Sequence, residues 1–228
     1  MVEYDPSKTL IFIHVPKTGG ISVKELVRSW FPERLRLHYY DEVAAKMPPK
    51  LDLERLESAG RAPVVYGHFN SLRGFGVEQY YPRVQQFLAI IREPYQLMVS
   101  QYFYRKKVGS DWKDQSIVPS GDLKDFVSQQ PVNMLNHFPR QINTNNYKEI
   151  IEKYFIGVGL TEFLPDSLQR FAQKLGVPFR AEELGHLNAT ARTDALPDEY
   201  RAVFRETHPL EYAVYDYVRA HFAPRSEA

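Results

Sequence analysis

The stretch Leu10-Ile-Phe-Ile-His-Val-Pro-Lys-Thr-Gly-Gly-Ile-Ser22 decides the fold of this chain. Its apolar first half predicts a buried strand, and the apolar residues that follow Ile21 recur at the spacing of a helix. A glycine pair at a strand-to-helix turn allows backbone N–H groups to converge on one point. Because the helix N-terminus and the ammonium of Lys17 both add positive charge there, we predict a site for a tetrahedral anion.

This turn differs from the loop of the P-loop NTPases. In that loop the lysine follows the second glycine, whereas Lys17 precedes Gly19 and Gly20. An NTPase also needs a magnesium ligand, usually an acid that ends a neighbouring strand. The apolar run 87–91 ends in Arg92, with Glu93 behind it. An ATP- and magnesium-dependent, kinase-like enzyme is therefore the alternative, and the pattern favours an anion site without a metal.

The composition narrows the classes of function. The chain has 228 residues, 43% of them hydrophobic, a net charge of +1 and no cysteine. A chain of this size can build one domain with a substantial core. The near-zero net charge argues against nucleic acid as a partner, and the missing cysteines exclude disulfides and thiolate metal sites. We expect a cytoplasmic protein, since we find neither a signal peptide nor a membrane-spanning run.

The alternation of apolar runs and helical patterns predicts an α/β fold. Strands are expected at 9–15, 63–69, 84–91 and 155–160, in a parallel sheet of about four or five strands flanked by helices. The expected helices cover 23–30, 51–59, 94–107, 122–129, 161–175, 197–206 and 209–222. The range 176–196 is expected to be a long loop. We predict a single domain over 1–228, with an insertion on the acceptor side at about 109–146.

Three blocks of this sequence resemble the sulfotransferases that use 3′-phosphoadenosine 5′-phosphosulfate (PAPS). Pro16-Lys-Thr-Gly-Gly-Ile-Ser22 is similar to their 5′-phosphosulfate loop. Arg92-Glu-Pro-Tyr-Gln-Leu-Met-Val-Ser100, followed by Tyr102, is similar to their 3′-phosphate motif. The third block joins Gly159-Leu-Thr-Glu162 to Asn188-Ala-Thr-Ala-Arg192. The order of the blocks is similar to the carbohydrate branch that includes the heparan sulfate 2-O-sulfotransferases.

The resemblance implies PAPS as the sulfuryl donor and no metal. The residues it implies at the 5′ phosphosulfate are Pro16, Lys17, Thr18, Gly19, Gly20, Ile21 and Ser22. The residues it implies around the 3′-phosphate are Arg92, Ser100, Asn188, Thr190 and Arg192. The chain departs from the family pattern at Ile21, where threonine is usual, at Glu93, where aspartate is usual, and at Leu97, where a second arginine is usual.

Lys17 and His68 are the candidate catalytic residues. In sulfuryl transfer, as in phosphoryl transfer, charge grows on the leaving oxygen, and the mobile ammonium of Lys17 suits that position. His68 follows an apolar strand, and ligand sites in open α/β sheets lie beyond the strand carboxyl ends. An imidazole there can accept the proton of a hydroxyl. The resemblance supports this role, since a Gly-His after the second strand carries the base in the 2-O-sulfotransferases.

Each of these residues also has a structural interpretation. Ser22 would be a helix N-cap, Ser100 a solvated helix position, and Arg92 the partner of Glu93 or Glu162 in a salt bridge. Lys17 would be an exposed turn lysine and His68 a strand cap. Two further sets of histidines are weaker candidates: His14 as a core or supporting residue, and His137 and His186 as loop residues near the acceptor.

We expect an acceptor that offers a hydroxyl group, on a saccharide or glycolipid. The variable segments 71–81 and 109–146 would recognise it, with a sugar-stacking platform among tyrosines 39, 40, 80, 81, 102 and 104. The non-enzymatic alternative is a relative that binds a nucleotide or glycan without turnover.

Overall fold

The computed structural model describes residues 1–184 and 198–222, and its core is a parallel five-stranded sheet. The strands are β1 (Leu10–His14), β2 (Leu35–His38), β3 (Val64–Gly67), β4 (Phe87–Ile91) and β5 (Phe155–Leu160). They lie in the order β2-β3-β1-β4-β5, and every pairing is parallel. The predicted single-domain α/β class with a parallel sheet is therefore confirmed.

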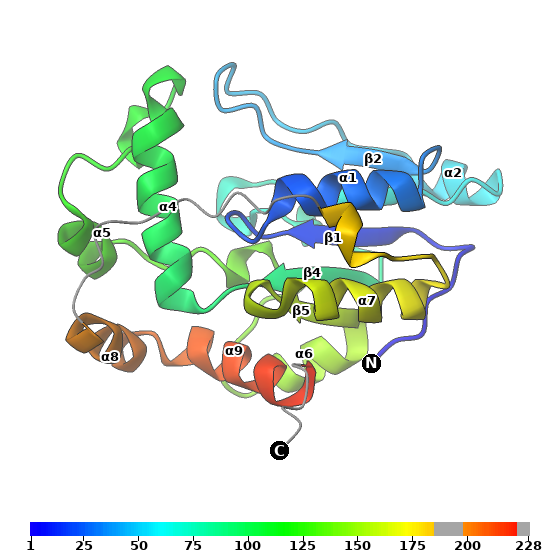
Figure 1. Cartoon of the computed structure of the whole chain (residues 1–228). Helices are drawn as coiled ribbons and strands as arrows, with labels where there is room; N and C mark the ends of the chain where they lie inside the picture. The colour runs from blue at the N-terminus through cyan, green and yellow to red at the C-terminus, as the bar shows by residue number, and fades with distance from the viewer. Residues whose placement is uncertain (185–197, 223–228) are drawn as a thin grey trace.

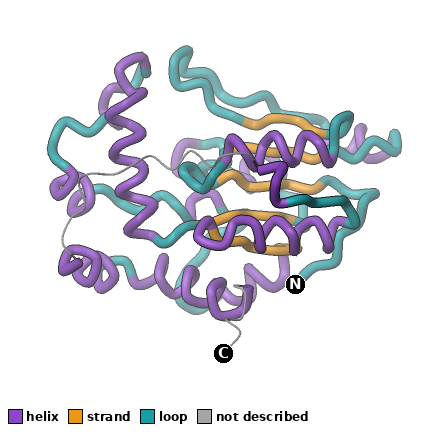
Figure 2. The backbone as a smooth tube through the Cα atoms, viewed as in Figure 1, coloured by secondary structure: helices purple, strands orange, loops and turns teal. Residues whose placement is uncertain are grey.

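Helices cover both faces of the sheet (Figures 1 and 2). One face packs on α1 (Gly20–Trp30) and α7 (Leu164–Leu175), which lie in front in Figure 1. The other face packs on α4 (Pro94–Val108), α5 (Leu123–Gln129), α6 (Tyr147–Tyr154) and α9 (Pro209–Phe222). The shorter α-helices are α2 (Leu53–Ser58), α3 (Val77–Tyr80) and α8 (Asp198–Thr207).

The strand β1 shows why the two layers form. Leu10 and Phe12 point to the α1 and α7 layer, whereas Ile11 and Ile13 point to the α4 and α9 layer. Successive side chains of a strand alternate between faces, so an apolar run of this kind is buried from both sides. All four residues are at most 2% exposed. The strand therefore forms the middle of the core and fixes where the following loop emerges.

The strand β2 was not predicted. Its sequence, Leu-Arg-Leu-His, is at the edge of the sheet, and Arg36 and Leu37 are exposed. A half-exposed edge strand lacks the continuous apolar run by which the buried strands are recognised. The three apolar strands predicted at 9–15, 63–69 and 84–91 are shorter in the structure, whereas 155–160 has the predicted bounds.

The helix ends differ from the predictions for local reasons. Asp52 caps α2 by accepting from the backbone N–H of Arg55, so this helix begins at Leu53 rather than at 51. The predicted helix 161–175 is divided into a 3₁₀ turn, Thr161–Phe163, and α7. Gly176 ends α7 at φ 67°, as a left-handed C-cap. Further 3₁₀ turns are Ser71–Arg73, Gly109–Asp111, Gln115–Ile117, Leu135–His137 and Ala181–Leu184.

Among the described residues, no helix combines the length and the apolar character that a membrane crossing requires.

Candidate functional site

Polar side chains follow three neighbouring strands at the carboxyl edge of the sheet, on its α1 face. The register pairs Phe12 with Tyr66, so the residues two positions further, His14 and His68, lie side by side. The pairing of β2 with β3 places Tyr39 on the other side of His68. Since ligands bind beyond the carboxyl ends of strands in open α/β sheets, this row lies where a site is expected.

The three side chains of this row are in contact. Nε2 of His68 lies 3.1 Å from Nδ1 of His14. The same Nδ1 atom lies 3.1 Å from the hydroxyl oxygen of Tyr39. The ring of Tyr66 stacks on that of His14, with centroids 5.5 Å apart, and its hydroxyl donates to the carbonyl of Gly20 at 3.0 Å. The histidine row is therefore anchored to the start of α1.

The loop between β1 and α1 adopts the conformation that an anion site requires. Lys17 and Gly19 have φ values of 72° and 84°, in the left-handed region. Gly19 is the N-cap of α1, and no side chain caps the helix. The first N–H groups of a helix have no partner within it, so they remain available to a bound anion. Ser22 is not the N-cap, which corrects the structural interpretation given above for this residue.

The buried hydroxyl of Thr18 supports the loop from below, donating to the carbonyl of Val15 at 2.7 Å. Gly20 is required by close approach, because a Cβ atom there would lie 1.8 Å from Nε2 of His14. The loop thus lies directly on the His14 ring. Ile21, by contrast, is 72% exposed beside the loop.

Arg92 joins the end of β4 to the loop. Its Nη1 atom donates to the carbonyl oxygen of Lys17 at 3.3 Å. The two acids considered as its salt-bridge partners have other roles. Glu93 caps α4 by accepting from the N–H of Gln96 at 2.8 Å, and Glu162 accepts from the N–H of Glu93 at 2.9 Å.

The next helix places two predicted positions differently from expectation. Ser100 is buried, at 9% exposure, so its interpretation as a solvated helix position is wrong. Leu97 is fully buried and belongs to the core, where an arginine would be an uncompensated charge. The first turns of α4 are therefore enclosed by protein, and only its later turns reach the surface.

Lys17 points from the loop toward the later turns of α4. Its Nζ atom lies 4.0 Å from the ring centroid of Tyr104, in a cation–π contact. Tyr104 is 44% exposed, and its ring centroid lies 6.1 Å from that of Trp112. The ammonium thus lies on one aromatic ring, which has a second ring beside it. Of the tyrosines considered for sugar stacking, Tyr104 is exposed, whereas Tyr81 is buried.

Burial keeps the histidines of the site neutral. The pKa of His68 is lowered to about 4, mainly by loss of solvent and also by the charges of Arg73 and His38. The pKa of His14 lies well below its ordinary value, first because of burial and then because of His68, His137 and Lys17. A neutral imidazole carries one ring lone pair and can accept a proton.

His137 approaches the site from the 3₁₀ turn Leu135–His137, with its ring centroid 6.1 Å from that of His68. Burial lowers its pKa to about 3, and neither of its ring nitrogens has a hydrogen-bond partner among the described residues. This partly supports the expectation that a histidine from a long loop reaches the site, although His137 itself is buried.

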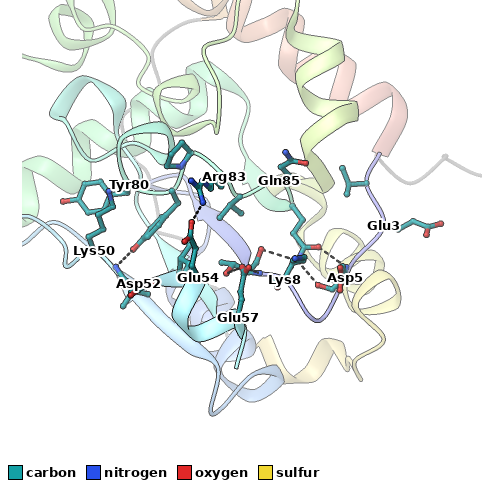
Figure 3. Close-up of a pocket in the computed structure, with 18 residues that line it drawn as sticks. Glu3, Asp5, Lys8, Lys50, Asp52, Glu54, Glu57, Tyr80, Arg83 and Gln85 are labelled. Atoms are coloured by element: carbon teal, nitrogen blue, oxygen red, sulfur yellow. Dashed lines mark hydrogen bonds and ion pairs between the residues drawn. The ribbon is translucent and has the colours of Figure 1, made fainter. Parts of the chain in front are cut away.

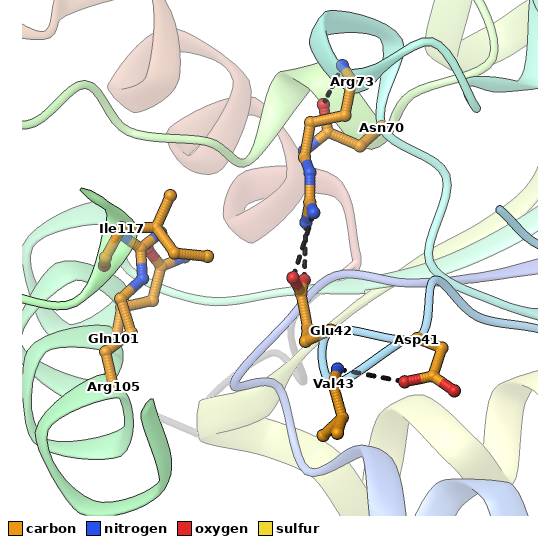
Figure 4. Close-up of polar contacts among 8 residues, drawn as sticks. All are labelled: Asp41, Glu42, Val43, Asn70, Arg73, Gln101, Arg105 and Ile117. Atoms are coloured by element: carbon orange, nitrogen blue, oxygen red, sulfur yellow. Dashed lines mark hydrogen bonds and ion pairs between the residues drawn. The ribbon is translucent and has the colours of Figure 1, made fainter. Parts of the chain in front are cut away.

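A charged pair whose arginine acts on His68 links two segments distant in sequence. Arg73 contacts Glu42 through both terminal nitrogens, one of them 3.0 Å from the carboxylate (Figure 4). The guanidinium lies 4.1 Å from the ring centroid of Tyr40. Arg105, from α4, donates to the carbonyl of Ile117 at 3.2 Å, and burial lowers its pKa. The hydrogen bonds of Arg105 are to neutral groups, and the nearby charge of Arg73 also lowers its pKa.

The remaining predicted positions, Asn188, Thr190, Arg192 and His186, lie outside the described residues. Within the described ranges, no three histidine, aspartate or glutamate side chains are grouped so as to hold a metal ion.

A hollow of about 900 Å³ lies at the opposite edge of the sheet, where β1 and β4 begin (Figure 3). Two of the side chains that border it bond to the backbone at and before the start of β1. Gln86 donates to the carbonyls of Asp5 and Thr9, at 2.9 and 3.2 Å, and Glu57 accepts from the N–H of Thr9 at 2.8 Å. These bonds fix the start of β1. The hollow is therefore separate from the site described above.

The sequence interpretation missed the contact of His14 with His68 and the role of Tyr39 beside them. A signal for the first was present, because His14 and His68 both end apolar runs, and adjacent parallel strands would place them together. Tyr39 was considered only for sugar stacking, because its place beside the histidines follows from β2, which was not predicted.

Two solved structures with a similar fold are sulfotransferases. The mouse sulfotransferase SULT7A1, solved in complex with PAP, aligns with a TM-score of 0.51 over 94% of this chain and 89% of its own, at 12% identity. A sulfotransferase from Alicyclobacillus acidocaldarius aligns with a TM-score of 0.51 over 91% of this chain and 96% of its own, at 14% identity. No protein-family model matches the sequence, and no curated protein matches it significantly.

Proposed function

We propose that this protein is a PAPS-dependent sulfotransferase that moves a sulfuryl group to a hydroxyl of a carbohydrate, such as a saccharide or glycolipid. The observation that carries the proposal is the meeting of three groups at one edge of the sheet: the uncapped loop with Lys17, the guanidinium of Arg92, and His68. The same fold holds PAP, adenosine 3′,5′-bisphosphate, in the mouse enzyme.

The chain offers suitable groups for both ends of the donor. Residues 16–22 would hold the 5′ phosphosulfate through backbone N–H groups at the start of α1. Arg92 and Ser100 would hold the 3′-phosphate, the arginine through its planar fork. Asn188, Thr190 and Arg192 are proposed to complete that pocket on the resemblance alone. When bound, PAPS supplies the activated sulfuryl group.

The residues of the chain have separate tasks in this proposal. Lys17 stabilises the charge that grows on the leaving oxygen, because its ammonium stands on the same loop. His68 takes the proton of the acceptor hydroxyl, and its neutral state at ordinary pH makes its lone pair available. The aromatic pair Tyr104 and Trp112 provides apolar faces beside Lys17, on which a sugar ring can stack.

Melting temperatures test the donor class. PAP without metal should raise the melting temperature, since a ligand that binds only the folded state stabilises it by mass action. ATP with magnesium should raise it much less. Equal effects of the two nucleotides, or a strict magnesium requirement, would favour the kinase-like alternative. If PAP binds with no turnover on any hydroxyl acceptor, the chain is a non-catalytic binding relative.

A further inference from the structure

The ring of His14 connects the anion loop to His68. Its Nε2 atom lies beneath Gly20, so near that a Cβ atom there would stand 1.8 Å away. Its Nδ1 atom faces Nε2 of His68 and the hydroxyl of Tyr39, each at 3.1 Å. The imidazole of His14 therefore contacts both the anion loop and His68.

The contact between His14 and His68 limits which of their ring nitrogens can carry a proton. A neutral imidazole carries one N–H and one lone pair. If Nδ1 of His14 held the proton and donated it to His68, the lone pair of His68 would be used at Nε2. Its Nδ1 would then carry a proton, and His68 would have no free lone pair for an acceptor hydroxyl.

The opposite arrangement leaves His68 ready to act as a base. If His14 is protonated at Nε2, its Nδ1 lone pair accepts from the Nε2–H of His68. The Nδ1 lone pair of His68 is then free. In this arrangement the Nε2–H of His14 lies at the loop, where it can donate to an anionic oxygen bound beside Gly20.

We propose that His14 is a positioning residue through which an anion in the loop fixes His68 in the tautomer that accepts a proton at Nδ1. This inference rests on the proposed function. A bound anion favours the Nε2–H form of His14, because an N–H next to a negative oxygen makes a charge-assisted hydrogen bond. Donor binding and readiness of the base are thereby linked through one side chain.

In this proposal, one proton moves to His68 and one bond to sulfur replaces another. His68 takes the hydroxyl proton at Nδ1 and becomes an imidazolium, while the acceptor oxygen forms its bond to sulfur. The bond between sulfur and the bridging oxygen breaks, and its electron pair leaves with the bisphosphate beside Lys17. The Nε2–H of the imidazolium continues to donate to Nδ1 of His14. This hydrogen bond stabilises the new positive charge of His68.

The tautomers can be observed directly by heteronuclear NMR of labelled histidine rings. With PAP bound, His68 should carry its proton at Nε2 and have an unprotonated Nδ1, and His14 should carry its proton at Nε2. A PAP-bound protein in which His68 is protonated at Nδ1 would overturn the inference. Failure of PAP to shift any signal would instead count against the proposed function, so the two failures are distinguishable.

Two variants separate positioning from packing. His14→Phe keeps a ring beneath Gly20 but has no acceptor, whereas His14→Asn places an amide oxygen near the position of Nδ1. We expect His14→Phe to lower kcat about tenfold to a hundredfold, less than loss of the base itself. Both variants lack the Nε2–H that donates to the bound anion, so the KM for PAPS should rise in both, while His14→Asn should recover most of the kcat.

The NMR readout in the variants completes the test. In His14→Phe, the His68 ring should populate both tautomers with PAP bound, while His14→Asn should restore the single Nε2–H form. Equal kcat values for the two variants with an unchanged His68 tautomer would show that His14 acts only by packing. His221→Phe, which changes an exposed histidine of α9, should alter neither quantity.

Discussion

Nη1 of Arg92 donates a hydrogen bond to the carbonyl oxygen of Lys17, at 3.3 Å. The bond ties the end of β4 to the loop after β1, and both strands belong to the centre of the sheet. Arg92 therefore supports the loop, and we propose that in the enzyme its guanidinium also contacts a 3′-phosphate. A substitution at this position must be tested for both.

Arg92→Ala should weaken the binding of PAP more than that of adenosine 5′-monophosphate. The lost charge-assisted contacts are worth about 1.5–3 kcal/mol, which corresponds to roughly a tenfold to hundredfold loss for PAP. The neutral bond to the Lys17 carbonyl is worth about 1 kcal/mol, so the monophosphate should lose less than tenfold. Calorimetric titration of both nucleotides measures this. An equal loss for both would mean that Arg92 only supports the loop.

Lys17 should show opposite effects on stability and activity. Its φ of 72° is strained for any residue with a Cβ atom. Lys17→Ala keeps this strain, whereas Lys17→Gly removes it, so the glycine variant should be more stable by up to about 1 kcal/mol. Both variants should lose turnover similarly while keeping PAP affinity within a few-fold. Chemical denaturation and single-turnover rates measure the two quantities. A glycine variant less stable than the alanine variant would contradict the strained conformation.

The pH dependence of the rate reports on His68. A base must be unprotonated to act, and burial lowers the pKa of His68 to about 4. The rising limb of kcat/KM should therefore lie near that value, rather than near the reference imidazole value of about 6.5. His68→Asn should lose about two to four orders of magnitude in kcat and flatten that limb. A wild-type limb near the reference value, or an unchanged profile in His68→Asn, would assign the base elsewhere.

Buried histidines should also make stability depend on pH. His38 is 1% exposed, stacks on Phe69 and has a pKa of about 4, lowered mainly by burial. Below about pH 6.5 the unfolded chain takes up a proton that the folded state refuses, so stability falls as the pH decreases. At pH 5 this costs about 2 kcal/mol for one such histidine.

His38→Phe tests this contribution, because phenylalanine keeps the stack and removes the titrating group. The variant should lose about 2 kcal/mol less than the wild type between pH 7 and pH 5. His221→Phe, at an exposed position, is the matched control and should follow the wild type. Denaturation curves at the two pH values measure the difference. Parallel losses in all three proteins would refute the low pKa of His38.

The central fold could be predicted because its signals are local. The apolar runs of β1, β3, β4 and β5 are buried on both faces, and burial of that kind leaves a continuous pattern in the sequence. The strand β2 is half exposed and has no such pattern. For the same reason, the place of Tyr39 beside His14 and His68 was not predicted.

The sequence predicted which residues belong to the candidate site, but it did not predict which of them are in contact. Gly19, Gly20 and Lys17 predict the loop, because a glycine pair at a strand-to-helix turn beside a lysine is typical of an anion site. The contact between His14 and His68 depends on the register of two strands separated by fifty residues of chain. Register follows from the whole sheet rather than from either segment, so it had to be seen in the structure.

The most direct measurement of the central claim is the transfer of a labelled group to an acceptor. The protein is incubated with PAPS labelled in its sulfuryl group and a panel of hydroxyl acceptors: desulfated glycosaminoglycans, glycolipids and simple phenols. A parallel reaction contains magnesium and ATP labelled in its terminal phosphate. We predict metal-independent labelling of a carbohydrate from PAPS, reduced at least a hundredfold in His68→Asn, and none from ATP. Labelling from ATP, or labelling from PAPS that His68→Asn and Lys17→Ala leave unchanged, would contradict the account.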